Sequence, residues 1–279
     1  MIDLNNVSYR YKSGTQALEG ISAEIGAGIH LLLGENGAGK TTLLHIMAGL
    51  LFPSTGTCTL DGEEIRKREP SVLRDIFFIT DDMKYPASTI NEFKRIHAPF
   101  YPTFDDETLT RNLIDFGMNG NEQLMKMSLG TRKKAQLAYA LALHTPILLL
   151  DEPANGLDIT SKKTLQAMMS RCIDETQTVV VSTHTVSDLQ HLYDSIIVLS
   201  KGRLMLSRPT WEITECIAFV DTQIPPVNSL YCEQEFGLFR SIIENVEGLS
   251  TDINYQLLYS ALHSPACHKI INAINNKER

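Results

Sequence analysis

The chain has 279 residues, of which 43% are hydrophobic and 21% charged, so it can bury a full core as one large domain or as one domain with an appendage. Its formal net charge of −8 argues against a protein that coats nucleic acid, because neutralising phosphates needs massed Lys and Arg. The five cysteines are scattered and include no C-x-x-C pair, so we expect neither a disulfide framework nor a zinc site.

No segment of the sequence predicts insertion into a membrane. A spanning helix needs about 18 or more consecutive apolar residues, and no run of that length occurs. The first residues, Met1–Leu4, show neither the basic stretch nor the apolar stretch of a signal peptide. We therefore expect a cytoplasmic protein that reaches a membrane only through another chain.

The first sixty residues have the pattern of β structure followed by a helix. Residues 2–9 and 16–25 mix Val, Ile and Leu with polar positions, and the turn residues at 12–14 indicate a hairpin-like pair. Residues 29–33 form a short apolar run of the kind found in buried strands. A helical pattern follows at 40–50, so the sequence predicts a strand, a glycine-rich loop and a helix in succession.

The middle of the chain changes from strand to helix patterns. Residues 57–60 and 76–80 predict further strands. Residues from about 86 to 145 have helical character, with a break at 98–102 that contains two prolines. We interpret this stretch as a helical subdomain inserted between strands of one core.

The core pattern resumes after the inserted helices. The runs at 147–150 and 179–182 are apolar apart from the serine that ends the second one, which is typical of parallel strands covered on both faces. Apolar residues between 165 and 172 recur at helical spacing and predict a crossover helix. Strands at 196–200 and 203–207 complete an α/β fold, with a mostly parallel sheet and an antiparallel β subdomain near its start.

The pattern becomes less regular from about residue 216. The Ile-Pro-Pro run at 224–226 indicates a loop, and residues 252–262 predict a terminal helix with Asp252 near its N-cap. We therefore divide the sequence into a main domain at 1–215 and a small C-terminal extension of unknown role at 216–279.

A glycine-rich loop separates the predicted strand at 29–33 from the helix after it. The loop reads Gly34-Glu35-Asn36-Gly37-Ala38-Gly39-Lys40-Thr41 and is followed by Thr42. It satisfies the pattern G-x-x-x-x-G-K-[ST] in full. Glycines allow the positive φ angles that let a backbone wrap around phosphates, and the N-terminus of the next helix favours anions. Lys40 is expected to neutralise the β- and γ-phosphates, and the Thr41 hydroxyl to ligate Mg²⁺. The loop by itself predicts binding of a nucleoside triphosphate.

Two carboxylates follow a predicted buried strand further along the chain. Asp151 and Glu152 come directly after the apolar run at 147–150, so they lie at the carboxyl edge of the sheet, where α/β folds bind ligands. One carboxylate can hold the hydrated metal while the next polarises an attacking water. Asp151 is therefore the expected metal ligand, and Glu152 the expected catalytic base.

With these motifs the sequence resembles the ABC ATPase family over residues 1 to about 215, which implies the P-loop NTPase fold of ABC type. Asp158 closes a segment that looks like the family's D-loop, and His184 follows the strand at 179–182 in a segment that looks like its switch loop. Tyr11 occupies the place of the aromatic residue that stacks on adenine in the family.

Residues 127–131 stand where the family has its signature, in a degenerate copy with Leu129 for a glycine and Thr131 for a glutamine. Ser128 and Gly130 remain, and a long apolar helix pattern follows them. In the family this segment contacts ATP that is held by a second subunit. The resemblance thus implies a head-to-tail dimer, here a homodimer, with two shared sites.

The glutamine of the family's Q-loop is missing, because no Gln occurs between Gln16 and Gln123. The strand at 76–80 places Asp81 or Asp82 in its position. An aspartate there can ligate Mg²⁺, but it adds negative charge near the γ-phosphate and has a shorter reach. Asp81 therefore joins the predicted metal ligands, and the substitution bears on the rate of hydrolysis and on its coupling to a partner.

The resemblance implies an ATPase that uses ATP and Mg²⁺, with Lys40, Glu152 and His184 in catalysis. The stretch at 100–107 and the degenerate signature look most like bacterial ATP-binding subunits of the ABC-2 export type, including antibiotic-responsive and bacteriocin-type ones. This implies a separate transmembrane permease as partner and a place at the inner face of the cell membrane. The transported substrate does not follow from these residues.

Two other functions stay open at this point. One is a soluble ABC ATPase without a transport role, of the cofactor-assembly type. The other is a nucleotide-gated interaction module that hydrolyses ATP weakly, which Asp81 supports and the intact Glu152 and His184 oppose. DNA-repair types need a heptad-rich insertion and translation factors need two ATPase halves, and the sequence has neither.

Overall fold

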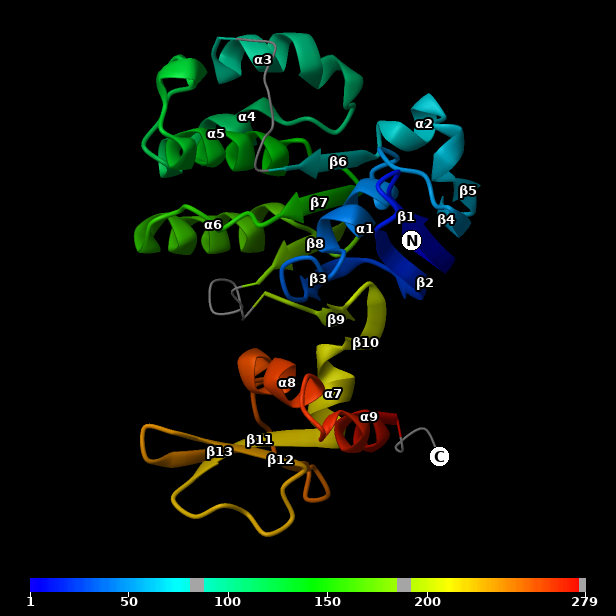
Figure 1. Ribbon diagram of the computed structural model, residues 1–279. Coiled ribbons are helices and arrows are strands. Elements are labelled where there is room, and N and C mark those ends of the chain that lie inside the picture. Colours follow the sequence, from blue (N-terminus) through cyan, green and yellow to red (C-terminus); the bar gives the residue numbers. More distant parts are fainter. Residues whose placement is uncertain (81–87, 185–191, 276–279) are drawn as a thin grey trace.

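A six-stranded sheet forms the centre of the molecule (Figure 1). The computed structural model describes residues 1–80, 88–184 and 192–275. Within the sheet, only the edge strand β10 pairs antiparallel with its neighbour, and the other pairs are parallel. The order is β10 (Arg203–Pro209), β9 (Ser195–Ser200), β3 (Gly28–Leu33), β8 (Thr178–Thr183), β7 (Ile147–Asp151) and β6 (Ile76–Ile79). Because β3, β8 and β7 are adjacent and parallel, the segments that follow them meet at one edge of the sheet.

Both faces of this sheet are covered, which explains why the central strands β3, β7 and β8 are largely apolar. On one face, Leu31, Leu150 and Val181 belong to a cluster shared with the long helices. On the other, Leu32 and Leu149 belong to a cluster shared with helix α1 (Lys40–Met47) and with the antiparallel strands. The predicted mostly parallel, doubly covered sheet is confirmed.

A second sheet packs beside α1 and is antiparallel. Its order is β2 (Gln16–Ile25), β1 (Ile2–Arg10), β4 (Thr55–Leu60) and β5 (Glu63–Glu64). Strands β1 and β2 pair with each other, so the hairpin-like pair predicted from the turn at 12–14 is confirmed. Two short helices, η1 (Ile65–Lys67) and α2 (Pro70–Leu73), then lead into β6.

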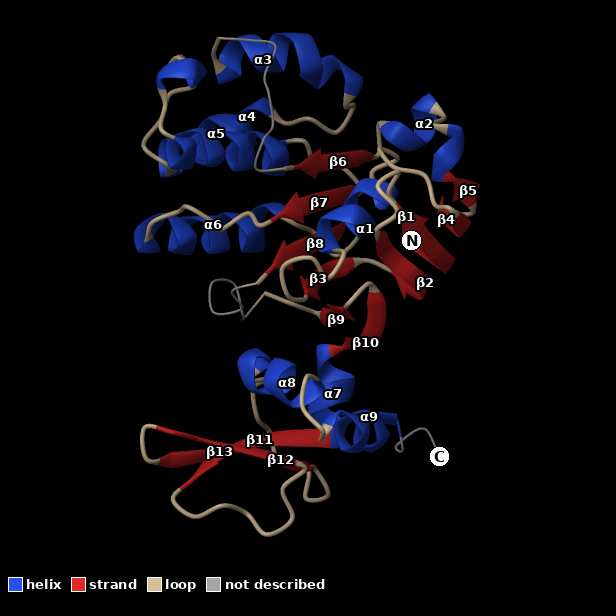
Figure 2. Cartoon of the chain, viewed as in Figure 1, coloured by secondary structure: helices blue, strands red, loops and turns tan. Residues whose placement is uncertain are grey.

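The inserted helices lie beside the β6 edge of the central sheet (Figure 2). They are α3 (Ile90–His97), η2 (Ala98–Phe100), α4 (Asp106–Asp115), η3 (Leu124–Lys126) and α5 (Leu129–Ala142), and α6 (Ile159–Cys172) is the crossover helix between β7 and β8. Side-chain caps start the longer ones: Thr89 accepts a hydrogen bond from the Glu92 N–H, and Asp105 from the Thr108 N–H. Of the described helices, none has both the length and the apolar character needed to cross a bilayer.

The C-terminal extension has more regular structure than its sequence pattern predicts. It follows helix α7 (Thr210–Cys216), which ends at the predicted boundary. Its own elements are β11 (Ile217–Thr222), β12 (Tyr231–Glu235), β13 (Leu238–Glu244), α8 (Tyr255–Leu262) and α9 (Cys267–Asn275). The three strands form an antiparallel sheet in the order β11-β13-β12. The predicted N-cap at Asp252 is wrong, because Asn254 caps α8 and its side chain accepts a hydrogen bond from the Leu257 N–H.

Helix α8 belongs to the main core of the molecule. Its buried Leu258 and Leu262 lie in the same continuous apolar cluster as residues of β3 and β9. The rings of Tyr193 and Tyr255 meet edge to face, with their centroids 5.8 Å apart. The division of the sequence at residue 215 stays a prediction, and across it the two parts share this core.

Cys58 in β4 offers a chemical test of the apolar cluster that α1 shares with the antiparallel strands. Its side chain is buried, and burial, with a smaller contribution from Asp3, raises the pKa of the thiol to about 12. Because the thiolate is the species that is alkylated, we expect iodoacetamide at pH 8 to spare Cys58 in the folded protein and to modify it in urea. Peptide mass spectrometry measures both, with the partly exposed Cys232 as a control that reacts in either state. Equal modification rates of the two thiols in the folded protein would contradict this packing.

Candidate functional site

The loop between β3 and α1 is held in a shape that only glycine permits at key positions. Gly37 and Gly39 have φ angles of 83° and 105°, in the region that side chains rarely adopt. A Cβ on Gly39 would lie 2.7 Å from the carbonyl oxygen of Ala17, and one on Gly34 would lie 2.6 Å from that of Leu199. The exposed Glu35 and Asn36 thus sit on a tightly packed turn that leads directly into the N-terminus of α1.

Lys40 folds back over this loop. Its Nζ donates hydrogen bonds to the carbonyl oxygens of Gly34 at 2.6 Å and Glu35 at 3.2 Å, and lies 4.0 Å from Glu152 Oε1. Only 6% of Lys40 is exposed. Burial lowers the pKa of its amine, and the nearby carboxylates of Glu152 and Asp151 oppose that shift. The structure thus places the positive group of the loop beside the carboxylates that end β7.

Thr41 and Asp151 form the second contact between these segments. The Thr41 hydroxyl donates to Asp151 Oδ2 at 2.8 Å, and the Ser182 hydroxyl donates to Oδ1 of the same carboxylate. The parallel register pairs Asp151 with Ser182 across β7 and β8, which is why both side chains reach one point. A hydroxyl and a carboxylate are the hard oxygen ligands that Mg²⁺ prefers.

Glu152 and His184 meet at the same edge. Glu152 Oε1 lies 2.9 Å from His184 Nδ1, and the Glu152 carboxylate is largely buried while the imidazole is partly exposed. The Glu152 N–H donates to both the carbonyl oxygen and the hydroxyl of Ser182, each at 3.1 Å. The backbone of Glu152 is left-handed, with a φ of 49°, which is unusual for a residue with a side chain.

Tyr11 lies beside the start of α1, just after β1. Its hydroxyl is 2.9 Å from Thr42 Oγ1, and its ring meets that of Tyr9 edge to face at 4.9 Å. The side chain is 40% exposed, so part of the aromatic surface is open to solvent next to the glycine-rich loop. This position is compatible with the predicted stacking role, which stays a prediction.

Ser128 and Gly130 lie at the start of α5, in the inserted helices. Ser128 is the N-cap of that helix, and its hydroxyl accepts a hydrogen bond from the Thr131 N–H at 3.2 Å. A Cβ on Gly130 would lie 2.9 Å from the carbonyl oxygen of Gly156, so the helix starts in contact with the predicted D-loop. Within the part of the chain that the structure describes, the hydrogen bonds of Ser128 run to Thr131 and Arg132 of its own helix and do not join it to Lys40 or Glu152.

Asp158 caps α6 and is tied to α5. Its carboxylate accepts hydrogen bonds from the Ser161 N–H at 2.8 Å and from Lys134 Nζ at 3.1 Å. The bonds from Ser161, and then that from Lys134, lower the pKa of this exposed carboxyl to about 2. Asp81 and Asp82, predicted for the Q-loop position, lie outside the described residues.

Three residues at or near this edge have contacts that the sequence motifs do not predict. Ser182 bonds to Asp151 and to the Glu152 N–H, because the parallel register places it opposite Asp151. Lys133 of α5 donates a hydrogen bond from Nζ to the backbone carbonyl of Glu152. Tyr259 of α8 lies against the glycine-rich loop: burial and the nearby Glu35 raise the pKa of its phenol, and a hydrogen bond from the Glu35 backbone opposes the rise.

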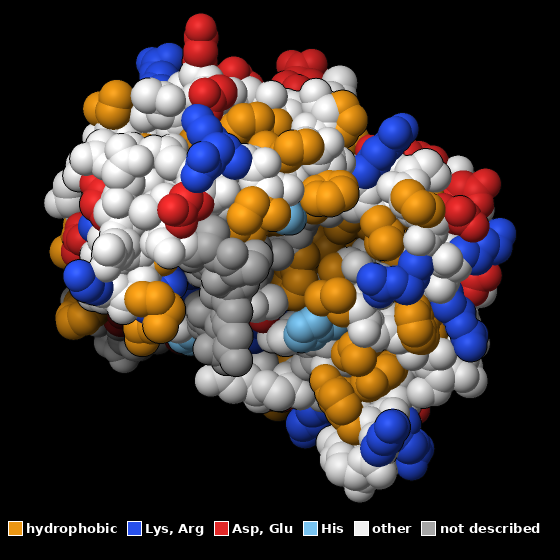
Figure 3. Space-filling model, turned by 90° about the horizontal axis from the view of Figure 1, so that it is seen from above, with side chains coloured by type: hydrophobic (Ala, Val, Ile, Leu, Met, Phe, Trp, Pro, Cys, Tyr) orange, Lys and Arg blue, Asp and Glu red, His pale blue; other side chains and the backbone are white. Residues whose placement is uncertain are grey.

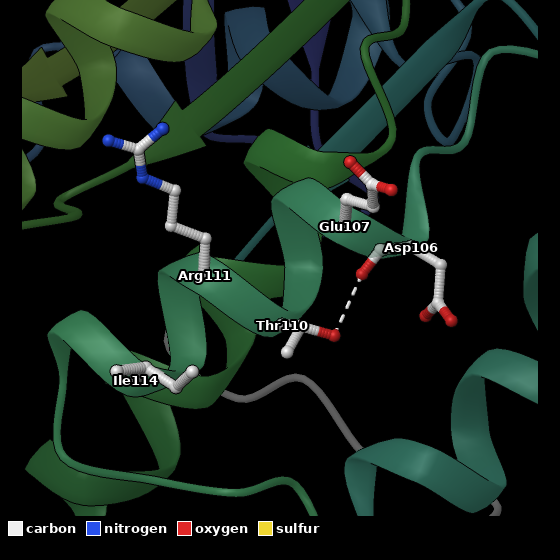
Figure 4. A pocket seen from close by; sticks show the side chains of 5 residues that line it. All are labelled: Asp106, Glu107, Thr110, Arg111 and Ile114. Carbon is white, nitrogen blue, oxygen red and sulfur yellow. Dashed lines mark hydrogen bonds between the residues drawn. The ribbon is translucent and has the colours of Figure 1, made fainter.

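A separate pocket of about 360 Å³ lies on the outer side of α4 (Figure 4). In the close-up its lining side chains come from successive turns of that one helix, and Thr110 donates a hydrogen bond to the Asp106 carbonyl oxygen. The lining residues are Asp106, Glu107, Thr110, Arg111 and Ile114. The pocket therefore belongs to the helical insertion rather than to the sheet edge.

Known proteins with similar sequences bind ATP, which agrees with the phosphate-binding arrangement at this edge of the sheet. A family profile described as ABC transporter matches residues 18–155. The ABC transporter ATP-binding protein NatA of Bacillus subtilis is 34% identical over 217 residues, which cover 74% of this chain and 88% of NatA. The chain belongs to the ABC transporter family. As an ABC ATPase subunit it binds and hydrolyses ATP.

Two further similarities support this ABC ATPase assignment. The energy-coupling factor transporter ATP-binding protein EcfA of Methanosphaera stadtmanae is 29% identical over 246 residues, covering 83% of this chain and 88% of EcfA. A dimeric structure of the ATP-binding cassette MJ0796, in a post-hydrolysis state bound to ADP and Pi, superimposes with a TM-score of 0.65 at 24% identity. It covers 75% of this chain and 98% of that one, and so confirms the predicted ABC-type fold. ABC ATPase subunits dimerise and work with transmembrane partners.

Proposed function

We propose that the chain is the ATP-driven motor subunit of a membrane exporter, in which ATP closes two copies face to face and hydrolysis lets them open. The observation that carries this proposal is the convergence of Lys40, Asp151 and Glu152 at one edge of the sheet, within hydrogen-bonding or ion-pairing reach of one another or of shared partners. An NTP-binding protein without turnover has no need for a buried carboxylate in that place.

Each residue of this group has a definite chemical task in the proposal. The glycine-rich loop and the N-terminus of α1 bind the phosphates through backbone N–H groups, and Lys40 leaves the loop carbonyls to neutralise the β- and γ-phosphates. Thr41 and Asp151 would hold Mg²⁺, which would supply charge neutralisation on the phosphate oxygens. Glu152 accepts the proton of the attacking water, while His184, at 2.9 Å, orients that carboxylate and faces the γ-phosphate.

The proposal assigns Ser128 and Gly130 to the site of the second protomer. Both lie at the N-terminus of the 14-residue helix α5, where the helix dipole and unpaired N–H groups favour a phosphate. Tyr11 stacks on the adenine of its own protomer's ATP, and Asp158 lies at the boundary between the two. Two identical copies in head-to-tail arrangement then form two equal sites.

A permease is proposed to dock on the face seen in Figure 3. Hydrophobic side chains gather there around a hollow, on the side of the molecule that carries α2 and α3. Large hydrophobic residues on or near these elements are well exposed, with Leu50 at 52%, Ile96 at 55% and Phe100 at 69%. Apolar patches of this kind mark protein interaction sites. Through this partner the subunit is held at the inner face of the membrane.

The export direction is the part of the proposal that an experiment in cells decides. The support for export is the resemblance of residues 100–107 and of the degenerate signature to the ABC-2 export type. We expect deletion of the gene to raise the cellular content of the transported compound and to deplete it from the medium, as measured by untargeted metabolite comparison. The Lys40→Ala protein should fail to restore the wild-type distribution. Loss of a compound from the cells, restored by the wild-type gene, would assign the subunit to an importer instead.

A further inference from the structure

The catalytic loop after β7 is braced from the side by helix α5. Gly130, Lys133 and Lys134 are spaced i, i+3 and i+4, so they share one face of that helix. Each contacts a different point of the loop: Gly130 the Gly156 carbonyl, Lys133 the Glu152 carbonyl, and Lys134 the Asp158 carboxylate at 3.1 Å. The face of α5 therefore follows the loop along its whole length.

The middle contact of the three is buried. Lys133 is 6% exposed, although it follows an exposed helix start and precedes an apolar run. A lysine side chain is rarely buried to this degree unless its amine is hydrogen-bonded or ion-paired. Its Nζ donates to the carbonyl oxygen of Glu152, so the contact falls on the backbone of the proposed base itself.

The backbone of Glu152 needs such support. Its φ of 49° is a left-handed conformation that is unfavourable for a residue with a Cβ, and conformations of this kind persist when surrounding contacts hold them. The N–H side is held by Ser182, at 3.1 Å from both its carbonyl oxygen and its hydroxyl. On the carbonyl side, the Asn155 N–H donates at 3.1 Å and closes a turn, and Lys133 occupies the second acceptor position.

We infer that Lys133 is a positioning residue, which fixes the backbone of Glu152 so that the carboxylate points at the γ-phosphate site. The inference rests on the proposed role of Glu152 as the base. The carboxylate lies 2.9 Å from His184 and 4.0 Å from Lys40, and a rotation of the Glu152 peptide would move it away from both. Proton abstraction needs that alignment, since small misplacements of a catalytic group cost much of its rate.

The same helix also begins at Ser128, which is proposed to contact ATP held by the other protomer. Lys133 lies five positions after Ser128, so little more than one turn of helix joins the ATP of one site to the base of the other. Nucleotide binding that moves the start of α5 therefore moves the support of Glu152 in the opposite site. The degenerate signature keeps this connection, because Gly130 still fits against Gly156.

The test separates turnover from binding. Lys133→Met keeps the length and apolar stem of the side chain and leaves the Asn155 N–H on the Glu152 carbonyl. We expect kcat for ATP hydrolysis to fall about 10- to 100-fold with KM for ATP changed less than about threefold. Lys133→Arg, which retains a donor, should recover a part of the lost kcat. The control Lys163→Met, an exposed lysine of α6, should behave as the wild type.

A double variant shows whether Lys133 acts through Glu152. If it does, Lys133→Met lowers kcat no further in a Glu152→Gln background. An unchanged kcat in Lys133→Met, a parallel change of kcat and KM with a lowered Tm, or a further loss in the double variant would overturn the inference. Lys133→Leu, which likewise has no donor, carries the same expectation if the methionine variant does not fold. Wild-type turnover in Glu152→Gln alone would instead overturn the assignment of the base.

Discussion

Replacing Glu152 by glutamine is expected to leave ATP bound and almost unhydrolysed. Glutamine keeps the size of the side chain and a hydrogen bond to His184, at 2.9 Å in the native protein, but its amide accepts no proton from water. We expect kcat to fall by about 10²- to 10⁴-fold, the range typical of a lost general base, with the Kd for ATP within a few-fold of the native value. Phosphate release and binding of a fluorescent ATP analogue, both with Mg²⁺, measure the two effects.

Loss of turnover also predicts a change in assembly. If hydrolysis lets the two copies separate, as proposed, the Glu152→Gln protein should accumulate as an ATP-bound dimer, visible by sedimentation, and should return to monomer when ATP is removed. Glu175→Gln, at an exposed position of the loop after α6, is the matched control and should turn over normally. Hydrolysis within about threefold of the native rate would rule out Glu152 as the base.

Mixing two inactive variants is expected to restore activity at one site per dimer. A Ser128→Arg protomer keeps its Lys40, and a Lys40→Ala protomer keeps its Ser128, so a mixed dimer has one site with both residues intact and one with neither. Random exchange makes half the dimers mixed, and with independent sites the mixture should then reach about a quarter of native activity, where each variant alone has close to none. Phosphate release from an equimolar mixture, with two affinity tags to count mixed dimers, measures this.

The structure sets the control for this experiment. Ser128 is also the N-cap of α5, so its replacement lowers stability by about 0.5–2 kcal/mol independently of any role in catalysis. Thr89→Ala removes the side-chain cap of another helix, α3, and shows what a comparable local loss does to turnover. Mixed dimers as inactive as their parents, or as active as the native protein, would exclude a role of Ser128 in the site of the other protomer.

A site residue can be predicted from sequence when it directly adjoins a segment whose pattern clearly predicts a strand or a helix. Lys40 follows glycines and a buried strand, and Asp151 ends four apolar residues, so each position is set by local sequence alone. Their convergence then follows from one rule, that neighbouring parallel strands end at the same edge. The role of Lys133 cannot be predicted in this way. Its partner is the backbone carbonyl of Glu152, and every residue type has such a carbonyl.

The C-terminal extension was hard to predict for a different reason. Strand β12 reads Tyr-Cys-Glu-Gln-Glu and has no alternation of apolar and polar residues. Its hairpin turn places Phe236 at a φ of 49°, where Asn or Asp is the usual signal. The sequence predicts helix α8 but not its N-cap, which is Asn254 instead of Asp252. The sequence cannot choose between them, because Asp and Asn are equally good N-cap residues.

The packing of α8 bears on how the molecule unfolds. Leu258 and Leu262 lie in one apolar cluster with the strands that carry the glycine-rich loop, and Tyr259 contacts that loop at Glu35. A segment that shares buried surface with the central sheet cannot detach without exposing that surface to water. The amide protons of α8 and β3 should therefore exchange with solvent as one cooperative unit, and nucleotide bound at the loop should slow exchange in both.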